Sequence, residues 1–224
     1  MGDSTLAQLQ TQIDELKQQL GVQQDVQAIR KLHFTYGYFM DKFMFDEIVD
    51  LFAEDATLYF LNGIFRGKAG ARRLYGSASG LRGPSRGMLF EHIISQDVID
   101  ISEDRMRAWG RFRCSLQAAI HDSKKDAPPS IPRQFIEGGI YENEYVKVDG
   151  VWKIKTFNYR ITFQARPEAG IHAAAGLLMV SDYSGTYPDL PRGPDELRES
   201  PAVWPETFVM PFHYVHPVTG RKLP

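Results

Sequence analysis

The sequence of 224 residues has little cysteine: Cys114 is its only thiol. One cysteine cannot form a disulfide within the chain or supply a cysteine-rich metal site, and such scarcity fits a reducing compartment. No basic segment followed by an apolar run opens the sequence, and no apolar run reaches the length of a membrane span. We therefore expect a cytoplasmic protein without a membrane partner.

The sequence also lacks an excess of charge, because 26 Lys and Arg residues face 28 Asp and Glu residues. A chain so balanced has no general electrostatic attraction to nucleic acid, and none is expected as a partner. No glycine-rich phosphate loop stands out. His213 and His216 lie three apart in a proline-rich stretch without an acidic residue nearby in sequence, so we expect aromatic packing there and no metal site.

Apolar spacing predicts helices in the first third of the chain. Over residues 4–21, apolar side chains recur at alternating steps of three and four, which places them on one helical stripe. This stripe should cover either the same domain or a neighbouring subunit. A second helix is predicted to begin near Asp25, which can cap it, and shorter helices are predicted at 46–52 and 67–76. The stripe consists of Leu6, Leu9, Ile13, Leu16 and Leu20.

Long strands follow the helices. The segregated order of helices and then antiparallel strands is typical of an α+β fold, and here it predicts one curved, cone-shaped sheet with helices covering its concave face. Nine of the 13 prolines lie after residue 165, together with several aromatic residues, so we expect an ordered extension that packs on a surface. The predicted strands are 57–61, 89–101, 105–120, 134–148 and 151–164, the last two joined by an Asp149-Gly150 turn.

Two stretches carry a family resemblance: "YGYFMDKFMFDEIVDLFAEDATLYF" and "YENEYVKVDGVWKIKTFNYR". Together they resemble the nuclear-transport-factor-2-like superfamily, and within it the SnoaL-like branch that includes polyketide cyclases and scytalone dehydratase. The resemblance covers about residues 24–165, which leaves an amphipathic helix over 1–23 and an extension over 166–224. It implies the cone fold, a deep hydrophobic pocket, no obligatory cofactor, and dimers or trimers built on the outer face of the sheet.

The resemblance also implies catalytic residues. "MDKFMFD" matches the stretch that holds the pocket aspartate of scytalone dehydratase, which falls on Asp41, and "LFEHII" matches its first pocket histidine, which falls on His92. The second catalytic histidine of that enzyme falls near Leu116, where this chain has no imidazole. A pocket asparagine of that enzyme falls at Tyr141, so this chain has a tyrosine in its place. These departures make that dehydration itself a poor expectation for this chain.

The residues themselves support part of this interpretation. Phe90, His92 and Ile94 share one side of a strand because side chains alternate. If that side faces the pocket, Asp41 can orient His92 as a general acid or base. Tyr141 is expected as a third catalytic residue, since a phenol can bind a substrate hydroxyl. The residues expected to line the substrate site are Tyr36, Tyr38, Tyr59, Phe60, Phe90, Cys114, Leu116 and Asn158.

The long first helix and the tail "WPETFVMPFHYVHPVTG" resemble a subgroup of sphingomonad lyases, which release formaldehyde from lignin-derived diaryl compounds without a cofactor. The resulting hypothesis is a cofactor-independent lyase on a hydrophobic phenolic substrate, such as a diarylpropane-1,3-diol that is deformylated to a stilbene through a quinone methide. In this hypothesis His92, oriented by Asp41, protonates the departing benzylic hydroxyl, and an unassigned base removes the proton of the terminal hydroxyl. Two alternatives stay open. One is another reaction in the same pocket, such as dehydration, isomerisation or cyclisation, and the other is a non-catalytic ligand carrier or assembly module.

Overall fold

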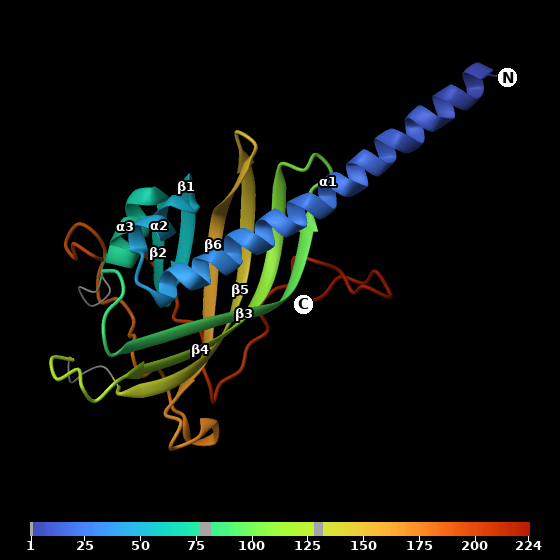
Figure 1. Ribbon diagram of the computed structural model, residues 1–224. Helices are drawn as coiled ribbons and strands as arrows, with labels where there is room; N and C mark the ends of the chain where they lie inside the picture. The colour runs from blue at the N-terminus through green and yellow to red at the C-terminus, as the bar shows by residue number, and fades with distance from the viewer. Residues whose placement is uncertain (1, 77–81, 128–131) are drawn as a thin grey trace.

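A computed structural model of the chain describes residues 2–76, 82–127 and 132–224. These residues form one seven-stranded sheet in the order β3-β4-β5-β6-β1-β2-β7, and its long strands curve around an apolar interior (Figure 1). Neighbouring strands run antiparallel, except that β1 and β6 run parallel. The predicted α+β cone is confirmed. The strands are β1 (Phe52–Phe60), β2 (Gly63–Arg66), β3 (Met88–Ile101), β4 (Arg107–Ile120), β5 (Gln134–Val148), β6 (Val151–Ala165) and β7 (Glu196–Leu197).

Helices cover the concave face and one end of the sheet (Figure 1). Helix α1 (Gly2–Asp41) packs its C-terminal half along β3, while α2 (Phe45–Asp50) and α3 (Gly67–Gly76) lie against β1 and β2. In β4, alternate side chains from Ala108 to Ile120 are buried. This period of two lets each long strand present one row of side chains to the helices and the other row outward.

The prediction of two separate N-terminal helices is wrong, because α1 continues unbroken through Asp25. Asp25 does not cap a helix start. Its side chain is 8% exposed, and its carboxylate accepts hydrogen bonds from Arg105 Nε at 2.7 Å, Lys147 Nζ at 2.6 Å and Trp152 Nε1 at 2.9 Å. Burial alone would raise the pKa of Asp25, but these donors outweigh it, and the pKa lies below its ordinary value. Asp25 thus joins α1 to the β3–β4 turn and to strands β5 and β6.

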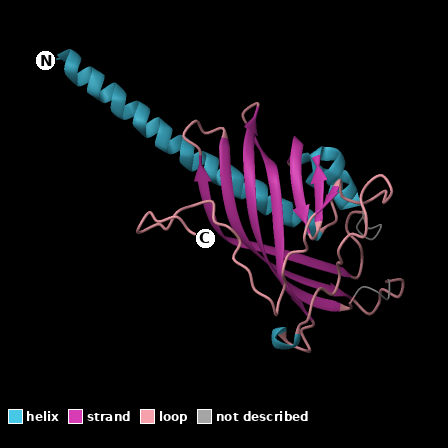
Figure 2. Cartoon of the chain, turned by 180° about the vertical axis from the view of Figure 1, so that it is seen from behind, coloured by secondary structure: helices cyan, strands magenta, loops and turns pink. Residues whose placement is uncertain are grey.

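The proline-rich extension follows the outer face of the sheet, where Figure 2 shows it as a long loop. Arg111 Nη2 donates to the carbonyls of Met210 at 2.8 Å and Pro211 at 2.6 Å, and its guanidinium carbon lies 3.9 Å from the ring centroid of Phe212. His213 binds the carboxylate of Glu142. The extension therefore packs on its own chain. None of the described helices combines the length and the apolar character needed to cross a membrane.

The bonds of Asp25 predict a large loss of stability in Asp25→Asn, because two partly buried cations lose their anionic partner. The free energy of unfolding should fall by about 3 kcal/mol. Because the pKa of Asp25 is lowered in the folded state, its contribution is present at neutral pH and is lost as the pH falls below about 4. Urea denaturation at neutral and acidic pH measures both effects.

The matched control is Asp50→Asn, because the side chain of Asp50 is 77% exposed. Its Oδ1 lies 3.6 Å from Lys68 Nζ, so it forms an ion pair at the surface. Such a surface pair contributes less than about 1 kcal/mol. An Asp25→Asn protein as stable as this control at neutral pH would contradict the role given to Asp25.

Candidate active site

The end of α1 and the middle of β3 bring a carboxylate to an imidazole. Asp41 Oδ1 lies 2.8 Å from His92 Nδ1 and accepts the backbone N–H of His92, also at 2.8 Å. The side chains are 13% and 7% exposed, respectively. Since the carboxylate can only accept when ionised, Nδ1 of a neutral His92 carries the proton and Nε2 keeps a free lone pair. An imidazole oriented in this way can act as a general base.

A row of directly paired residues crosses four strands from this histidine. His92 on β3 pairs with Leu116 on β4, Leu116 pairs with Glu137 on β5, and Glu137 pairs with Gln164 on β6. Residues paired directly across antiparallel strands point to the same face, so all four face the interior. Because neighbouring strands lie about 4.8 Å apart, the backbones at His92 and Glu137 are roughly 10 Å apart.

Glu137 is a second carboxyl group in this interior. Its Oε1 accepts the hydroxyl of Tyr159 at 2.6 Å, and its Oε2 accepts Gln164 Nε2 at 2.5 Å. Burial raises the pKa of Glu137, and these two hydrogen bonds and the nearby His92 offset only part of that effect. Glu137 can therefore hold its proton to a higher pH than an exposed glutamate and can serve as a general acid.

Aromatic rings pack on the same interior face as His92 and Glu137. Tyr141 and Tyr159 are stacked with centroids 4.3 Å apart, and the ring of Phe90 lies 6.4 Å from that of His92. A side chain at Gly139 would place its Cβ 2.2 Å from the hydroxyl oxygen of Tyr159, so the glycine makes room for this ring. Cys114 is buried on the same face, and burial raises its pKa to about 12, so it carries no thiolate at neutral pH.

The start of the extension closes the site next to Glu137. Gln164 Oε1 accepts the backbone N–H groups of Leu178 at 2.6 Å and Met179 at 3.1 Å, while its Nε2 binds Glu137. Apolar side chains from Leu177 to Val180 pack against the core. Gln164 thus ties this segment of the same chain to the buried carboxyl group.

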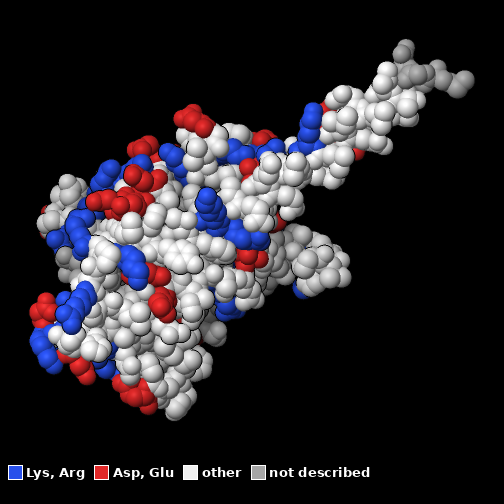
Figure 3. Space-filling model, viewed as in Figure 1, with Lys and Arg blue, Asp and Glu red and all other residues white. Residues whose placement is uncertain are grey.

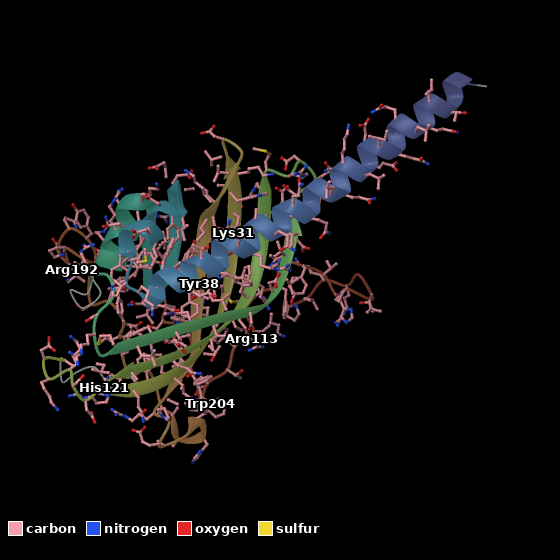
Figure 4. The ribbon with its side chains drawn as sticks, viewed as in Figure 1. Lys31, Tyr38, Arg113, His121, Arg192 and Trp204 are labelled. Carbon is pink, nitrogen blue, oxygen red and sulfur yellow. The ribbon has the colours of Figure 1, made fainter. Side chains whose placement is uncertain are left out.

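The structure brings together most of the predicted site residues but not all of them. Tyr38 is 74% exposed on the side of α1 that faces away from the strands, where Figure 4 labels it together with Lys31. Tyr59 and Asn158 pair across β1 and β6 on the outer face, and the guanidinium of Arg198 covers the Tyr59 ring at 4.9 Å. These three predictions are corrected, because helical and strand periodicity turns their side chains away from the interior. The interior contains Asp41, His92, Tyr36, Phe60, Phe90, Cys114, Leu116 and Tyr141.

Sequence reasoning missed Glu137, Tyr159 and Gln164. Strand alternation could have found Glu137. It lies two residues before Gly139 and four before Tyr141, so its side chain is on the face predicted for Tyr141. Tyr159 follows from the same alternation on β6, where Phe157 and Ile161 are buried. No comparable signal marks Gln164, because its role depends on contact with residues 178 and 179.

A further histidine lies deeper in the core. The ring of His33 is 4.1 Å from that of Phe112 and 4.6 Å from that of Tyr141, and burial lowers its pKa to about 3. It is therefore neutral at physiological pH and packs as an aromatic ring. Within the described parts of the chain, no three His, Cys, Asp or Glu side chains lie close enough together to bind one metal ion.

Comparisons with two solved dehydrochlorinase structures support the fold, and a third solved structure is similar in sequence. LinA matches with a TM-score of 0.54 and 18% identity, over 71% of this chain and 99% of LinA. The LinA-type3 hexachlorocyclohexane dehydrochlorinase from Novosphingobium barchaimii LL02 matches with a TM-score of 0.53 and 18% identity, over 73% and 99%. A proposed scytalone dehydratase from Novosphingobium aromaticivorans is 24% identical over 74% of this chain and 91% of its own, with a TM-score of 0.48.

No curated protein matches the sequence. The family model described as "SnoaL-like domain" matches residues 23–158. This range is more than half of the chain. It contains Asp41, His92 and Glu137, and it ends before Tyr159 and Gln164. The chain therefore belongs to the SnoaL-like domain family.

Proposed function

We propose that this protein is a cofactor-independent lyase that acts on a hydrophobic aromatic substrate by acid–base catalysis. The observation that carries the proposal is the arrangement of the Asp41–His92 pair and Glu137 on one interior face, separated by Leu116. A base and an acid held about two strand spacings apart can act on two positions of one bound molecule. The stacked rings of Tyr141 and Tyr159 favour an aromatic ligand.

The substrate that we propose is a diarylpropane-1,3-diol with a para-phenol, as the sequence resemblance suggested. Glu137 would donate its proton to the benzylic hydroxyl, which leaves as water, and the phenol would stabilise the resulting cation as a quinone methide. His92 Nε2 would then remove the proton of the terminal hydroxyl. Cleavage of the carbon–carbon bond releases formaldehyde, and its electrons form the double bond of a stilbene. One proton is donated and one is removed, so the step needs no oxidant or reductant.

Asp41 has a positioning role in this scheme. By accepting both the ring and the backbone N–H of His92, it fixes the tautomer that leaves Nε2 free, and it stabilises the imidazolium that forms. Dehydration alone is the second candidate function, because the same acid and base could remove water without breaking a carbon–carbon bond.

The first test measures formaldehyde and stilbene from a phenolic diarylpropane-1,3-diol. His92→Ala and Asp41→Asn should each lower kcat/KM by about 10²–10⁴-fold, the usual contribution of a positioned base. His172→Ala is the matched control, because His172 is exposed and lies outside the site. Water loss without formaldehyde would identify the dehydration instead. Full activity in His92→Ala would refute the proposed chemistry.

The second test uses the pH dependence of kcat/KM. If Glu137 is the acid, the rate should fall on the alkaline side as Glu137 loses its proton, at a pH above the ordinary glutamate value because its pKa is raised. Glu137→Gln should remove this alkaline limb and lower the maximal rate by at least about 100-fold.

Tyr159→Phe gives an independent check, since it leaves the carboxyl group in place. The Tyr159 hydroxyl stabilises the ionised form of Glu137, so its loss should raise the pKa of Glu137 further and move the alkaline limb to higher pH. An alkaline limb that stays at the same pH in both variants would show that another group titrates.

A further inference from the structure

The N-terminal half of α1 carries an uncovered apolar stripe. We call Leu6, Leu9, Ile13, Leu16 and Leu20 the N-terminal seam; these side chains are between 45% and 67% exposed. Every residue from 5 to 20 is exposed. Figures 1 and 2 show this part of the helix projecting beyond the sheet. The sequence left open whether the stripe covers its own domain or a neighbouring subunit, and its own domain does not cover it.

The seam also lies on the side of the helix that faces away from its own domain. With about 100° of rotation per residue, the seam is centred on roughly the opposite side of the helix from Ile29, His33 and Tyr36, the residues that α1 buries against the sheet. After Leu20 the side of the seam continues with polar residues at 24, 27 and 31. The helix therefore has two apolar faces, one for its own domain and one that ends where the domain begins.

This projecting helix has little to hold it in place. Residues 5–20 contact the domain through a hydrogen bond from Gln18 Nε2 to the carbonyl of Glu103 at 3.1 Å. The segment exposes five large apolar side chains to water, so a partner that buries them would stabilise it. The alternating steps of three and four are those of the a and d positions of a coiled coil, which a second helix can cover.

The residues that flank the seam favour an identical partner. In the heptad that places Leu6, Ile13 and Leu20 at position a, the flanking e and g positions hold Thr5, Gln10, Gln12, Lys17 and Gln19. One charge among these five positions means that a second copy meets no row of like charges, whereas a strongly charged partner helix would find no complement. Figure 3 shows the projecting helix as a largely uncharged surface.

We propose that the N-terminal seam binds the seam of a second copy of this chain, so that two domains are joined by a short helical coiled coil. This association differs from one built on the outer sheet face, part of which the chain's own residues 210–213 cover. It leaves the Asp41–His92 pair untouched, so it does not depend on the proposed function.

Sedimentation velocity of the full chain tests the proposal. The wild type should sediment with about twice the 25.5 kDa mass of one chain at micromolar concentration. Leu9→Glu/Leu16→Glu should weaken self-association by at least ~100-fold, because four large apolar side chains are lost from the paired seams. Gln8→Glu/Thr11→Glu adds the same charge to the other side of the helix and should keep the mass of the wild type.

Both substituted seam residues are exposed, so the domain should remain folded, which circular dichroism and thermal unfolding would check. A wild-type protein that stays at the mass of one chain would overturn the proposal. Self-association of equal strength in the Leu9→Glu/Leu16→Glu protein would also overturn it, because the copies would then meet through another surface.

Discussion

The candidate site depends on the contact between the end of α1 and the centre of β3, where one oxygen of Asp41 binds both the ring and the backbone N–H of His92. The contact fixes where the helix ends on the sheet and which nitrogen of the imidazole is free. A partly buried carboxylate is tolerated there because it is hydrogen-bonded, and the same bonds give the histidine a defined tautomer. Structure and chemistry therefore depend on the same two hydrogen bonds.

The interior combines this pair with a polar network that a purely structural core would not need. Glu137 is buried, accepts from Tyr159 and Gln164, and is connected through Gln164 to the backbone of Leu178 and Met179. Burying a carboxyl group is unfavourable unless hydrogen-bond donors replace the lost water. At Glu137 the donors do so only in part, and burial still raises its pKa. The cost is understandable where a carboxyl group must hold its proton to a higher pH than usual, as in an acid–base site.

The order and periodicity of the predicted elements were enough to predict the cone, whereas the meeting of Asp41 with His92 was implied by the family resemblance. Alternation along β3 placed Phe90 on the same side as His92, and the family resemblance placed Cys114 on the pocket side of β4. The errors arose where a local pattern carried no information on distant partners. Asp25 looked like a helix cap because its three donors lie 80 or more residues away, and Tyr38 and Tyr59 were chosen by residue type although their sides of the helix and strand face outward.

The most direct test of the central claim is a ¹⁵N NMR measurement of the His92 ring, assigned by comparison with His92→Ala. We expect neutral His92 to carry its proton on Nδ1, bound to Asp41, and the resonance of the free Nε2 to shift when a phenolic diarylpropane-1,3-diol is added. A His92 ring protonated on Nε2 in its neutral form, or a ring whose resonances do not respond to the diol, would contradict it.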